Sequence, residues 1–280
     1  MSKNYLQNKT VVISGASGGI GFAVSKLLIE KYNCNIIGIA RNEKKILSSI
    51  ETLGDKKSNF KYYLFDVSSR QNWLDFAKTL EKENIQVDVL INNAGFMLPF
   101  AKFEKYSDEE IDEIINTDFC SVLYSIKALL TNLKKSKTPA IINVSSAAGL
   151  CAVVGQSMYC ATKFAVRGLT ETLQQDYKNQ IYVGGVYPGF IRTDILNRQT
   201  PNGKENKLIN KLMMPLDKAS KKIVKGIARK KKKIVMGIDG RPMSFLGRIF
   251  PHFTPSLTRS VLKASKLEMF EEVFDYQEKK

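Results

Sequence analysis

The stretch TVVISGASGGIGFAVSKLLIEKY, residues 10–32, contains the three features that decide the fold. Its first five residues form an apolar, β-branched run that predicts a buried strand, and its last twelve predict an amphipathic helix. Between them, Gly15, Gly19 and Gly21 allow a tight turn and a close approach to a pyrophosphate, whose charge is favoured at a helix N-terminus. The alternative is an ordinary glycine-rich turn, but the strand before it and the helix after it favour a nucleotide site.

The same alternation of short apolar runs and longer amphipathic stretches continues along the chain. It predicts βαβ units and a parallel sheet covered on both faces, a doubly wound α/β fold of Rossmann type with about seven strands. We expect a dinucleotide-binding and catalytic domain at 1–237 and a basic, amphipathic, helical extension at 238–280. Strand-like runs lie at 10–14, 35–40, 62–65, 87–92, 140–145, 181–187 and 233–237, and the clearest helical stretches at 21–32, 108–133 and 217–229.

Composition excludes several classes of protein. The 280 residues are 44% hydrophobic, enough for a buried core, and neither a signal-peptide-like start nor a run of eighteen apolar residues is present. Four cysteines without metal-ligand spacing favour reduced thiols and a cytoplasmic protein. The chain has one histidine, His252. A histidine-based triad or multi-histidine metal site is therefore excluded, and we expect no metal.

One interval suggests acid–base chemistry. In SAAGLCAVVGQSMYCATKFAV, residues 146–166, Tyr159 lies four residues before Lys163 and thirteen after Ser146. On a helix, residues four apart share a face, so the ammonium would favour phenolate and lower the pKa of the phenol. A phenol tuned in this way is a usable general acid or base. The alternative is an ordinary helix with a Tyr and a Lys on one side.

The residue after the second strand indicates the cofactor. Sites that prefer NAD place an acidic residue there to bind the ribose 2′-hydroxyl, whereas this chain has Arg41 and no acid until Glu43. A guanidinium suits a 2′-phosphate, so we expect NADP (NADPH) to be preferred over NAD. A solvated arginine at a helix start is the alternative.

Together these motifs resemble the short-chain dehydrogenase/reductase family over roughly residues 9–237. The extension is similar to that of some hydroxysteroid dehydrogenase-like members. The family's motifs match the glycine-rich turn at 14–21, Asp66 and Val67 after the third strand, Asn92-Asn93-Ala94-Gly95 after the fourth, Asn116 in the following helix, Ser146, Tyr159 and Lys163, and Pro188, Gly189 and Thr193 after the sixth.

The resemblance implies an enzyme that interconverts a ketone and a secondary alcohol. In it Tyr159 donates the proton, Lys163 lowers the pKa of the phenol and binds the nicotinamide ribose, Ser146 binds the substrate oxygen, and Asn116 positions a water beside Lys163. The cofactor-binding residues that it implies, Arg41 included, are Ser14, Gly15, Ser17, Gly19, Ile20, Gly21, Arg41, Asp66, Val67, Asn93, Ala94, Gly95, Tyr159, Lys163, Pro188, Gly189, Ile191 and Thr193.

The segments expected to line the substrate pocket are mostly apolar: 96–100, 149–155, Tyr187 and Phe190. They suit a hydrophobic steroid- or lipid-like ketone or alcohol, although core packing would explain the same residues. The polar loop 195–215 is expected to act as a lid.

The tail carries most of the charge, since +12 of the net +16 lies in residues 196–280. It also has an apolar stripe, which Pro251 and Pro255 would split into short helices. The stripe has three readings: packing on the parent domain or over the pocket, a dimer interface in a homo-oligomer (dimer or tetramer), or peripheral contact with the inner face of a membrane, helped by the basic run 228–235. The stripe consists of Met243, Leu246, Phe250, Phe253, Leu257 and Val261.

A different class of function stays open: a non-catalytic NADP-binding scaffold whose basic C-terminal region binds nucleic acid or an anionic membrane. Nucleic acid is the less favoured partner, because the lysine run has no interleaved stacking aromatics and no recognition motif is present.

Overall fold

The computed structural model describes residues 5–193, 213–237, 240–250 and 252–274. Seven parallel strands form one sheet in the order β3-β2-β1-β4-β5-β6-β7. Successive strands are added in one direction from β1 to β3 and in the other direction from β4 to β7. The switch point lies between β1 and β4, and doubly wound folds bind their ligand at such a point. The strands are β1 Thr10–Ser14, β2 Asn35–Ala40, β3 Phe60–Leu64, β4 Val89–Asn92, β5 Ala140–Val144, β6 Tyr182–Pro188 and β7 Lys233–Met236.

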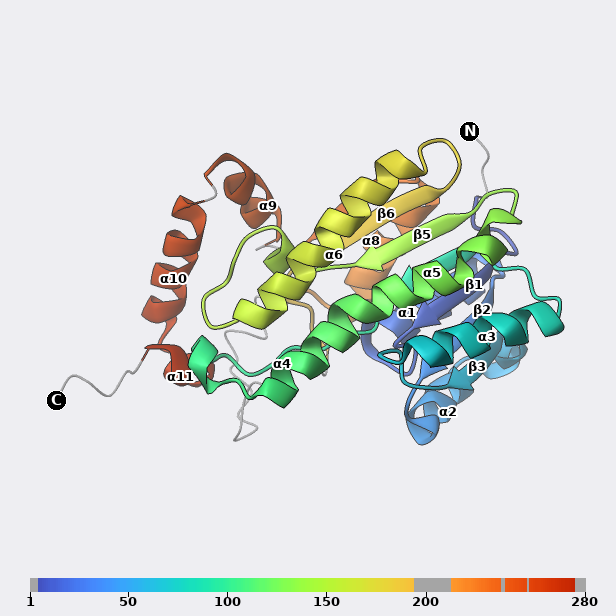
Figure 1. Ribbon diagram of the computed structural model, residues 1–280, viewed down its shortest axis with the longest axis horizontal. Helices are drawn as coiled ribbons and strands as arrows, with labels where there is room; N and C mark the ends of the chain where they lie inside the picture. The colour runs from blue at the N-terminus through green and yellow to red at the C-terminus, as the bar shows by residue number, and fades with distance from the viewer. Residues whose placement is uncertain (1–4, 194–212, 238–239, 251, 275–280) are drawn as a thin grey trace.

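Helices cover both faces of the sheet (Figure 1). On one face lie α1, α2 and α8, and on the other α3, α5 and α6. The helices are α1 Gly19–Tyr32, α2 Glu43–Glu51, α3 Arg70–Lys82, α4 Asp108–Ile115, α5 Ser121–Lys134, α6 Ser157–Asp176, α8 Leu216–Ala228, α9 Gly240–Ile249, α10 Phe253–Ser265 and α11 Glu271–Phe274; shorter turns are η1 Gly54–Asn59, η2 Phe103–Lys105, η3 Asn116–Cys120, η4 Ala147–Gly149 and η6 Glu268–Phe270.

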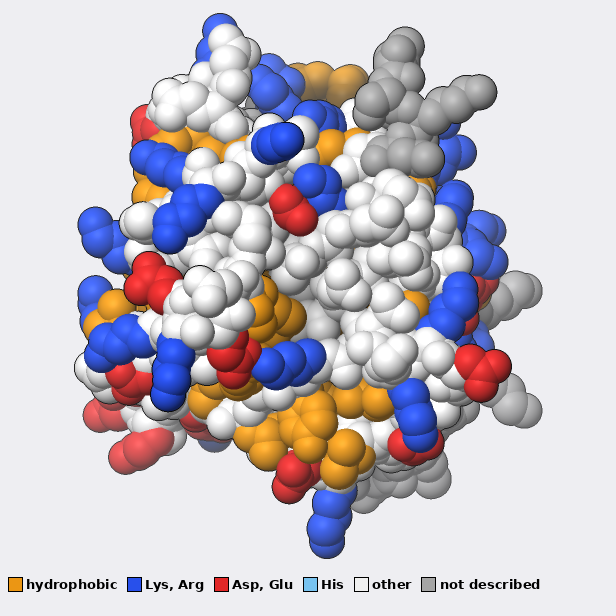
Figure 2. Space-filling model, turned by 90° about the vertical axis from the view of Figure 1, so that its right-hand side faces the viewer, with side chains coloured by type: hydrophobic (Ala, Val, Ile, Leu, Met, Phe, Trp, Pro, Cys, Tyr) orange, Lys and Arg blue, Asp and Glu red, His pale blue; other side chains and the backbone are white. Residues whose placement is uncertain are grey.

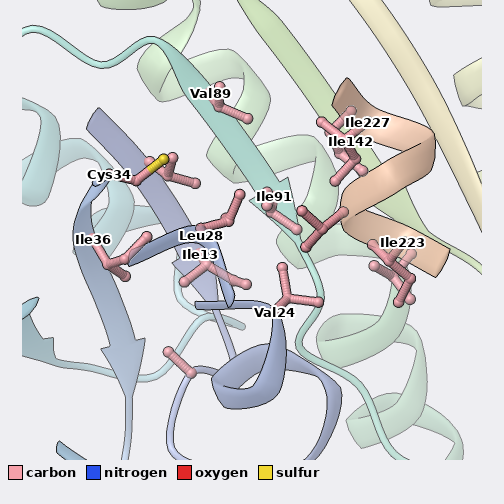
Figure 3. Packing of buried hydrophobic residues seen from close by; sticks show 14 of the residues in the cluster. Ile13, Val24, Leu28, Cys34, Ile36, Val89, Ile91, Ile142, Ile223 and Ile227 are labelled. Atoms are coloured by element: carbon pink, nitrogen blue, oxygen red, sulfur yellow. The ribbon is translucent and has the colours of Figure 1, made fainter. Parts of the chain in front are cut away.

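The strands are apolar along their whole length because both faces are buried. β5, for example, is buried at all five positions. On the α1/α8 face, Ile13, Leu28 and Ile223 belong to one cluster of buried side chains (Figure 3). On the opposite face, Trp73 packs with helix α5, and its indole donates to the carbonyl of Val67 at 2.9 Å. Each face thus has its own core, and the predicted doubly wound fold is confirmed.

The strand-like runs match the observed strands to within a few residues, but the helical stretch at 108–133 is not one helix. It consists of α4, the π-helical turn η3 and α5. A capping box between Ser107 and Glu110 starts α4. The apolar periodicity runs through all three pieces, so it cannot reveal the wider turn. That turn changes which side chains point toward the site.

The C-terminal elements lie together at one end of the molecule, toward the carboxyl ends of the strands (Figure 1). The chain divides between α9 and α10, as expected near Pro251. Pro255, however, does not end a helix: it occupies the first turn of α10, where no intrahelical N–H bond is required. The stripe is therefore split into short helices as expected, with the break near Pro251 and none at Pro255.

The apolar stripe of the tail is not buried against the domain. Phe250, Phe253, Leu257 and Val261 are exposed, by 39–61% of their surface. Leu246 is half-buried, and the side chain of Met243 lies outside the described residues, as does most of the expected lid loop. Packing against the domain therefore does not account for the stripe.

Surface charge is spread rather than gathered on the face shown in Figure 2, where acidic side chains interrupt the basic ones. This face, which lies opposite α9 and α10, therefore has no continuous basic stripe of the kind typical of nucleic-acid-binding proteins. Among the helices that the structure describes, none combines the length and the apolar composition needed to cross a bilayer.

Candidate active site

The turn between β1 and α1 forms one end of a cavity of about 520 Å³. Gly15 and Gly19 adopt left-handed φ angles of 68° and 51°, which side chains other than glycine rarely adopt. A Cβ at Gly21 would collide with the carbonyl oxygen of Gly15. The turn therefore packs closely against the start of α1, and its glycine backbone lines the cavity. A dinucleotide pyrophosphate fits this cradle at the helix N-terminus.

Polar side chains fix the floor of this cradle. The hydroxyl of Ser14 accepts hydrogen bonds from the backbone N–H groups of Asn93 and Ala94, both at 3.0 Å. The side chain of Asn93 in turn donates to the carbonyl of Ser14 at 2.9 Å. These bonds join the ends of β1 and β4, two neighbouring strands far apart in sequence. Asn93, Ala94 and Gly95 line the cavity, whereas Ser14 supports it from behind.

Arg41 and Lys45 bring positive charge to the same end of the cavity. A guanidinium nitrogen of Arg41 lies 3.9 Å from a carboxylate oxygen of Asp66, and both side chains are exposed. Lys45, in the first turn of α2, lies against Gly18. Our sequence reasoning missed Lys45. The sequence signal for it was a further cation, after Arg41, in the first turn of the helix that follows β2. Val67 packs in the core and, like Asp66, does not line the cavity.

Ser146, Tyr159 and Lys163 meet in the middle of the cavity. Ser146 follows β5, while Tyr159 and Lys163 project from one face of α6, with the ammonium 5.5 Å from the phenol ring centroid. The hydroxyl of Ser146 accepts from the N–H of Ala148 at 3.1 Å. The neighbouring Ser145 instead donates to the backbone carbonyl of Lys163 at 2.8 Å. Its hydroxyl is occupied by α6, which supports the assignment of Ser146 rather than Ser145.

The electrostatics of the phenol differ from the expectation. Burial raises the pKa of Tyr159, and Asp118 raises it further, while Lys163 and a hydrogen bond with Ser146 lower it. The net direction is upward. Lys163 therefore acts on the phenol as predicted, but burial outweighs its effect because a phenolate loses its hydration in the protein interior.

Asp118 is a second residue near this site, after Lys45, that our sequence reasoning missed. Its carboxylate lies 3.0 Å from the Lys163 ammonium, and the two side chains are 0% and 5% exposed. The other carboxylate oxygen accepts from the N–H of Phe96 at 2.9 Å. Asn116, two residues earlier, does not line the cavity, and its side chain has no hydrogen bond among the described residues. The only signal in the sequence was that Asp118 is the one charged residue between positions 114 and 126.

The segment after β6 closes the cavity opposite the glycine turn. Pro188, Gly189, Ile191 and Thr193 line it together with Ser17 and Ile20 from the β1–α1 side. A bridge between Ile191 and Met214 holds this segment to the start of the α8 region. The methyl group of Thr193 comes within 3.8 Å of the position that a Cβ on Gly19 would take. The two walls of the cofactor site are therefore in close proximity.

The far end of the cavity is mainly apolar. It is lined by Phe96, Met97, Phe100, Phe190, Ala148 and Val153. One amide interrupts this surface: Gln156 is 1% exposed and donates to the carbonyl of Leu98 at 2.9 Å, while its Oε1 has no hydrogen-bond partner among the described residues. Sequence reasoning did not single out Gln156. An apolar pocket with one acceptor oxygen suits a hydrophobic molecule that carries a hydroxyl group.

The fold and the cavity define a class: a nucleotide-dependent oxidoreductase. Comparison with known proteins agrees, since the model of the family described as short chain dehydrogenase matches residues 9–204. The chain belongs to the short-chain dehydrogenase/reductase family, whose members act on CH–OH groups with NAD(P).

Two relatives and one solved structure illustrate the relationship. The 3-oxoacyl-[acyl-carrier-protein] reductase FabG of Vibrio harveyi is 34% identical over 191 residues, 68% of this chain and 76% of the relative. The oxidoreductase SadH of Mycobacterium tuberculosis is 31% identical over 262 residues, 87% and 91% of the two chains. An alcohol dehydrogenase from Thermococcus sibiricus is 25% identical, with a TM-score of 0.68 and coverage of 78% and 90%. They establish the family without specific support for a hydroxysteroid dehydrogenase-like tail.

Proposed function

We propose that this enzyme uses NADP to interconvert a hydrophobic ketone and its secondary alcohol. The observation that carries the proposal is the single cavity in which Ser146, Tyr159 and Lys163 separate a glycine-lined, cationic end from an apolar end. One end fits a dinucleotide and the other an apolar substrate. The three side chains between them lie where the two reactants would meet.

The preference for NADP rests on two cations. Arg41 and Lys45 both line the dinucleotide end of the cavity, and a 2′-phosphate would give each an anionic partner that NAD lacks. Glu43, the first acid after β2, is exposed and accepts a hydrogen bond from Tyr62 at 3.1 Å. The alcohol dehydrogenase from Thermococcus sibiricus is described in complex with 5-hydroxy-NADP, which supports the same assignment.

The apolar end of the cavity supports a steroid- or lipid-like substrate. Phe96, Met97 and Phe100 offer surface on which an aliphatic or fused-ring skeleton packs. The relative from Vibrio harveyi is named as a reductase of a 3-oxoacyl group on acyl-carrier-protein, which is an oxo group on an acyl chain. Gln156 adds one amide oxygen, to which a hydroxyl substituent on such a skeleton would donate a hydrogen bond.

The chain's own residues would each have one task in the reduction. The bound NADPH supplies the hydride to the carbonyl carbon. Tyr159 holds the proton that the carbonyl oxygen receives, because its hydroxyl faces the cavity beside Ser146. Ser146 hydrogen-bonds the oxygen as negative charge develops there. Lys163 keeps a positive charge beside the phenol, which stabilises the phenolate left after proton transfer.

Tyr159→Phe tests this function. NADPH binding is expected to stay nearly unchanged, while ketone reduction falls by about a hundredfold or more, the usual contribution of a positioned general acid. Lys163→Ala is expected to weaken both. Turnover is followed by NADPH oxidation against a panel of hydrophobic ketones, with binding measured by fluorescence.

Tyr182→Phe is the matched control, because Tyr182 donates to the carbonyl of Lys231 at 2.7 Å and does not line the cavity. If the Tyr159→Phe enzyme kept more than a few per cent of wild-type turnover, Tyr159 would not be the acid.

A further inference from the structure

The Asp118–Lys163 pair is the most deeply buried ion pair among the described residues, and the proposed mechanism does not use its acidic member. The atoms lie 3.0 Å apart, and neither side chain exceeds 5% exposure. A Cβ built on Gly95 would lie 3.0 Å from the carboxylate and 3.1 Å from the ammonium, so the pair packs directly against the Gly95 backbone. The geometry therefore leaves the ammonium little freedom.

The π-helical turn puts Asp118 in this position. In η3, the N–H of Ser121 bonds to the carbonyl of Asn116, five residues back instead of four. The wider turn falls between α4 and α5, and Asp118 is fully buried within it. Its first oxygen is held by the N–H of Phe96, and its second faces Lys163 without meeting hydrogen-bond geometry. A carboxylate held in this way is a fixed counter-ion.

We propose that Asp118 is a positioning residue that keeps Lys163 protonated and directed at Tyr159. The proposal rests on the function proposed above. Lys163 must carry its charge to assist Tyr159, yet burial alone would drive a lysine toward its neutral form. A buried ammonium also needs a close opposite charge, because an unpaired buried charge is strongly destabilising.

The pKa directions agree with this geometry. Burial lowers the pKa of Lys163, but Asp118 and Tyr159 raise it by more, so the net direction is upward. The pKa of Asp118 is raised by burial against the lowering effect of Lys163 and of the Phe96 N–H. At a contact of 3.0 Å we take the pair as ionised. Asp118 also raises the pKa of Tyr159, so it limits how acidic the phenol becomes.

Two other titratable groups act on this cluster. Glu113 in α4 is exposed and raises the pKa of Asp118. Cys160, next to Tyr159 in α6, raises the pKa of the phenol. Burial in turn raises the pKa of Cys160 to about 11, which keeps that thiol neutral near pH 7. Asp118 is therefore the buried negative charge whose removal should lower the pKa of both Tyr159 and Lys163.

The test is Asp118→Asn, which retains the shape and an acceptor for the Phe96 N–H but removes the charge. Ketone reduction requires protons on both Tyr159 and Lys163, and loss of a nearby anion lowers the pKa of each. The alkaline limb of the kcat/KM profile should therefore move to lower pH. The NADPH Kd, measured by fluorescence, should begin to rise at a correspondingly lower pH.

Glu113→Gln is the matched control, since it removes the same charge from the exposed face of the neighbouring helix and should leave both profiles in place. A lower rate for Asp118→Asn with the alkaline limb unmoved would reduce Asp118 to a packing role and overturn the proposal. So would a shift of the limb to higher pH.

A second measurement covers a variant that folds poorly. Under the proposal, Asp118→Asn leaves an uncompensated buried ammonium, so adding Lys163→Met should raise the urea midpoint above that of the single variant. A double variant less stable than Asp118→Asn would contradict the pairing. This result needs neither substrate nor cofactor, so a wild type without ketone reductase activity would reject the proposed function and still leave the role of Asp118 decided.

Discussion

Arg41 and Lys45 show how single residues set the choice of cofactor. Both are on the surface of the cavity, and Arg41 is more than half exposed with only a loose ion pair to Asp66. An exposed pair of this kind contributes little to stability. A guanidinium in that position has a role in binding, because its planar fork matches two phosphate oxygens at once.

We expect Arg41→Asp to raise the Kd for NADPH by roughly tenfold or more and to change the Kd for NADH little, since a charge-assisted contact is lost and repulsion is added. Lys45→Ala should have a smaller effect in the same direction. Lys44→Asp is the control: it makes the same charge change one residue away from Lys45, outside the cavity. Equal affinity of the wild type for both cofactors would remove this assignment.

At the scale of elements, η6 and α11 pack behind the apolar end of the site. Phe270, Val273 and Phe274 pack into the same cluster as Tyr159 and Phe100. The rings of Phe100 and Phe270 meet edge to face, with centroids 4.7 Å apart. Since Phe100 also lines the cavity, η6 and α11 support one of its walls. Nothing in the predicted stripe pointed to these three residues.

Phe270→Ala should lower the free energy of unfolding by about 3–5 kcal/mol, because Phe270 is 2% exposed and its removal leaves a cavity. It should also raise KM for a hydrophobic ketone more than it changes kcat, as the wall formed by Phe100 loosens. Urea unfolding and steady-state kinetics measure the two effects. Phe253→Ala, a change at a 61% exposed position of α10, should alter stability by no more than about 0.5 kcal/mol. If Phe270→Ala lowered the free energy of unfolding as little as Phe253→Ala does, Phe270 would not be part of the core.

For the whole molecule, the tail presents apolar and basic side chains together. Phe245, Ile249, Phe250, Phe253, Leu257 and Val261 make up six of the eleven large hydrophobic side chains exposed on the described residues. Residues 240–267 contain five Lys and Arg and no Asp or Glu. An apolar surface without acidic residues is complementary to an anionic bilayer, at whose interface such helices lie without crossing it.

We expect the full-length protein to sediment with anionic vesicles at low salt and to be partly released at about 0.5 M salt, where the Debye length is roughly 4 Å. Phe253→Ser with Val261→Ser should weaken this binding, whereas Phe103→Ser, at an exposed phenylalanine outside the tail, should not. Point variants are a cleaner test than truncation after Gly237, which would also remove Phe270 and its packing. Protein that stays in the supernatant with anionic vesicles at low salt would leave a dimer surface as the reading of the stripe.

The strands, the order of the motifs and the family could be predicted from the sequence because each rests on local patterns. A run such as 10–14 is apolar throughout because both faces of a parallel sheet are buried, and this requirement is visible without coordinates. The glycine turn and the Tyr159–Lys163 interval are likewise local, since the geometry of one turn or one helix dictates them. The two cations at the cofactor end were only half predicted, because Lys45 depends on how α2 packs beside the turn.

Other features depend on contacts between residues far apart in the chain. The sequence spacing of Asp118 and Lys163 is 45 residues, and only the π-helical turn and the packing of α6 against it bring them together. The upward pKa shift of Tyr159 has the same origin, because desolvation depends on everything that surrounds the phenol. Periodicity also could not decide whether Phe253 or Phe270 is buried. A helical stripe indicates that one face of a helix is apolar, but not which other element covers that face. The sequence by itself determined the fold and the chemical groups of the site, while the tertiary structure decided their charges, their neighbours and which apolar face stays exposed.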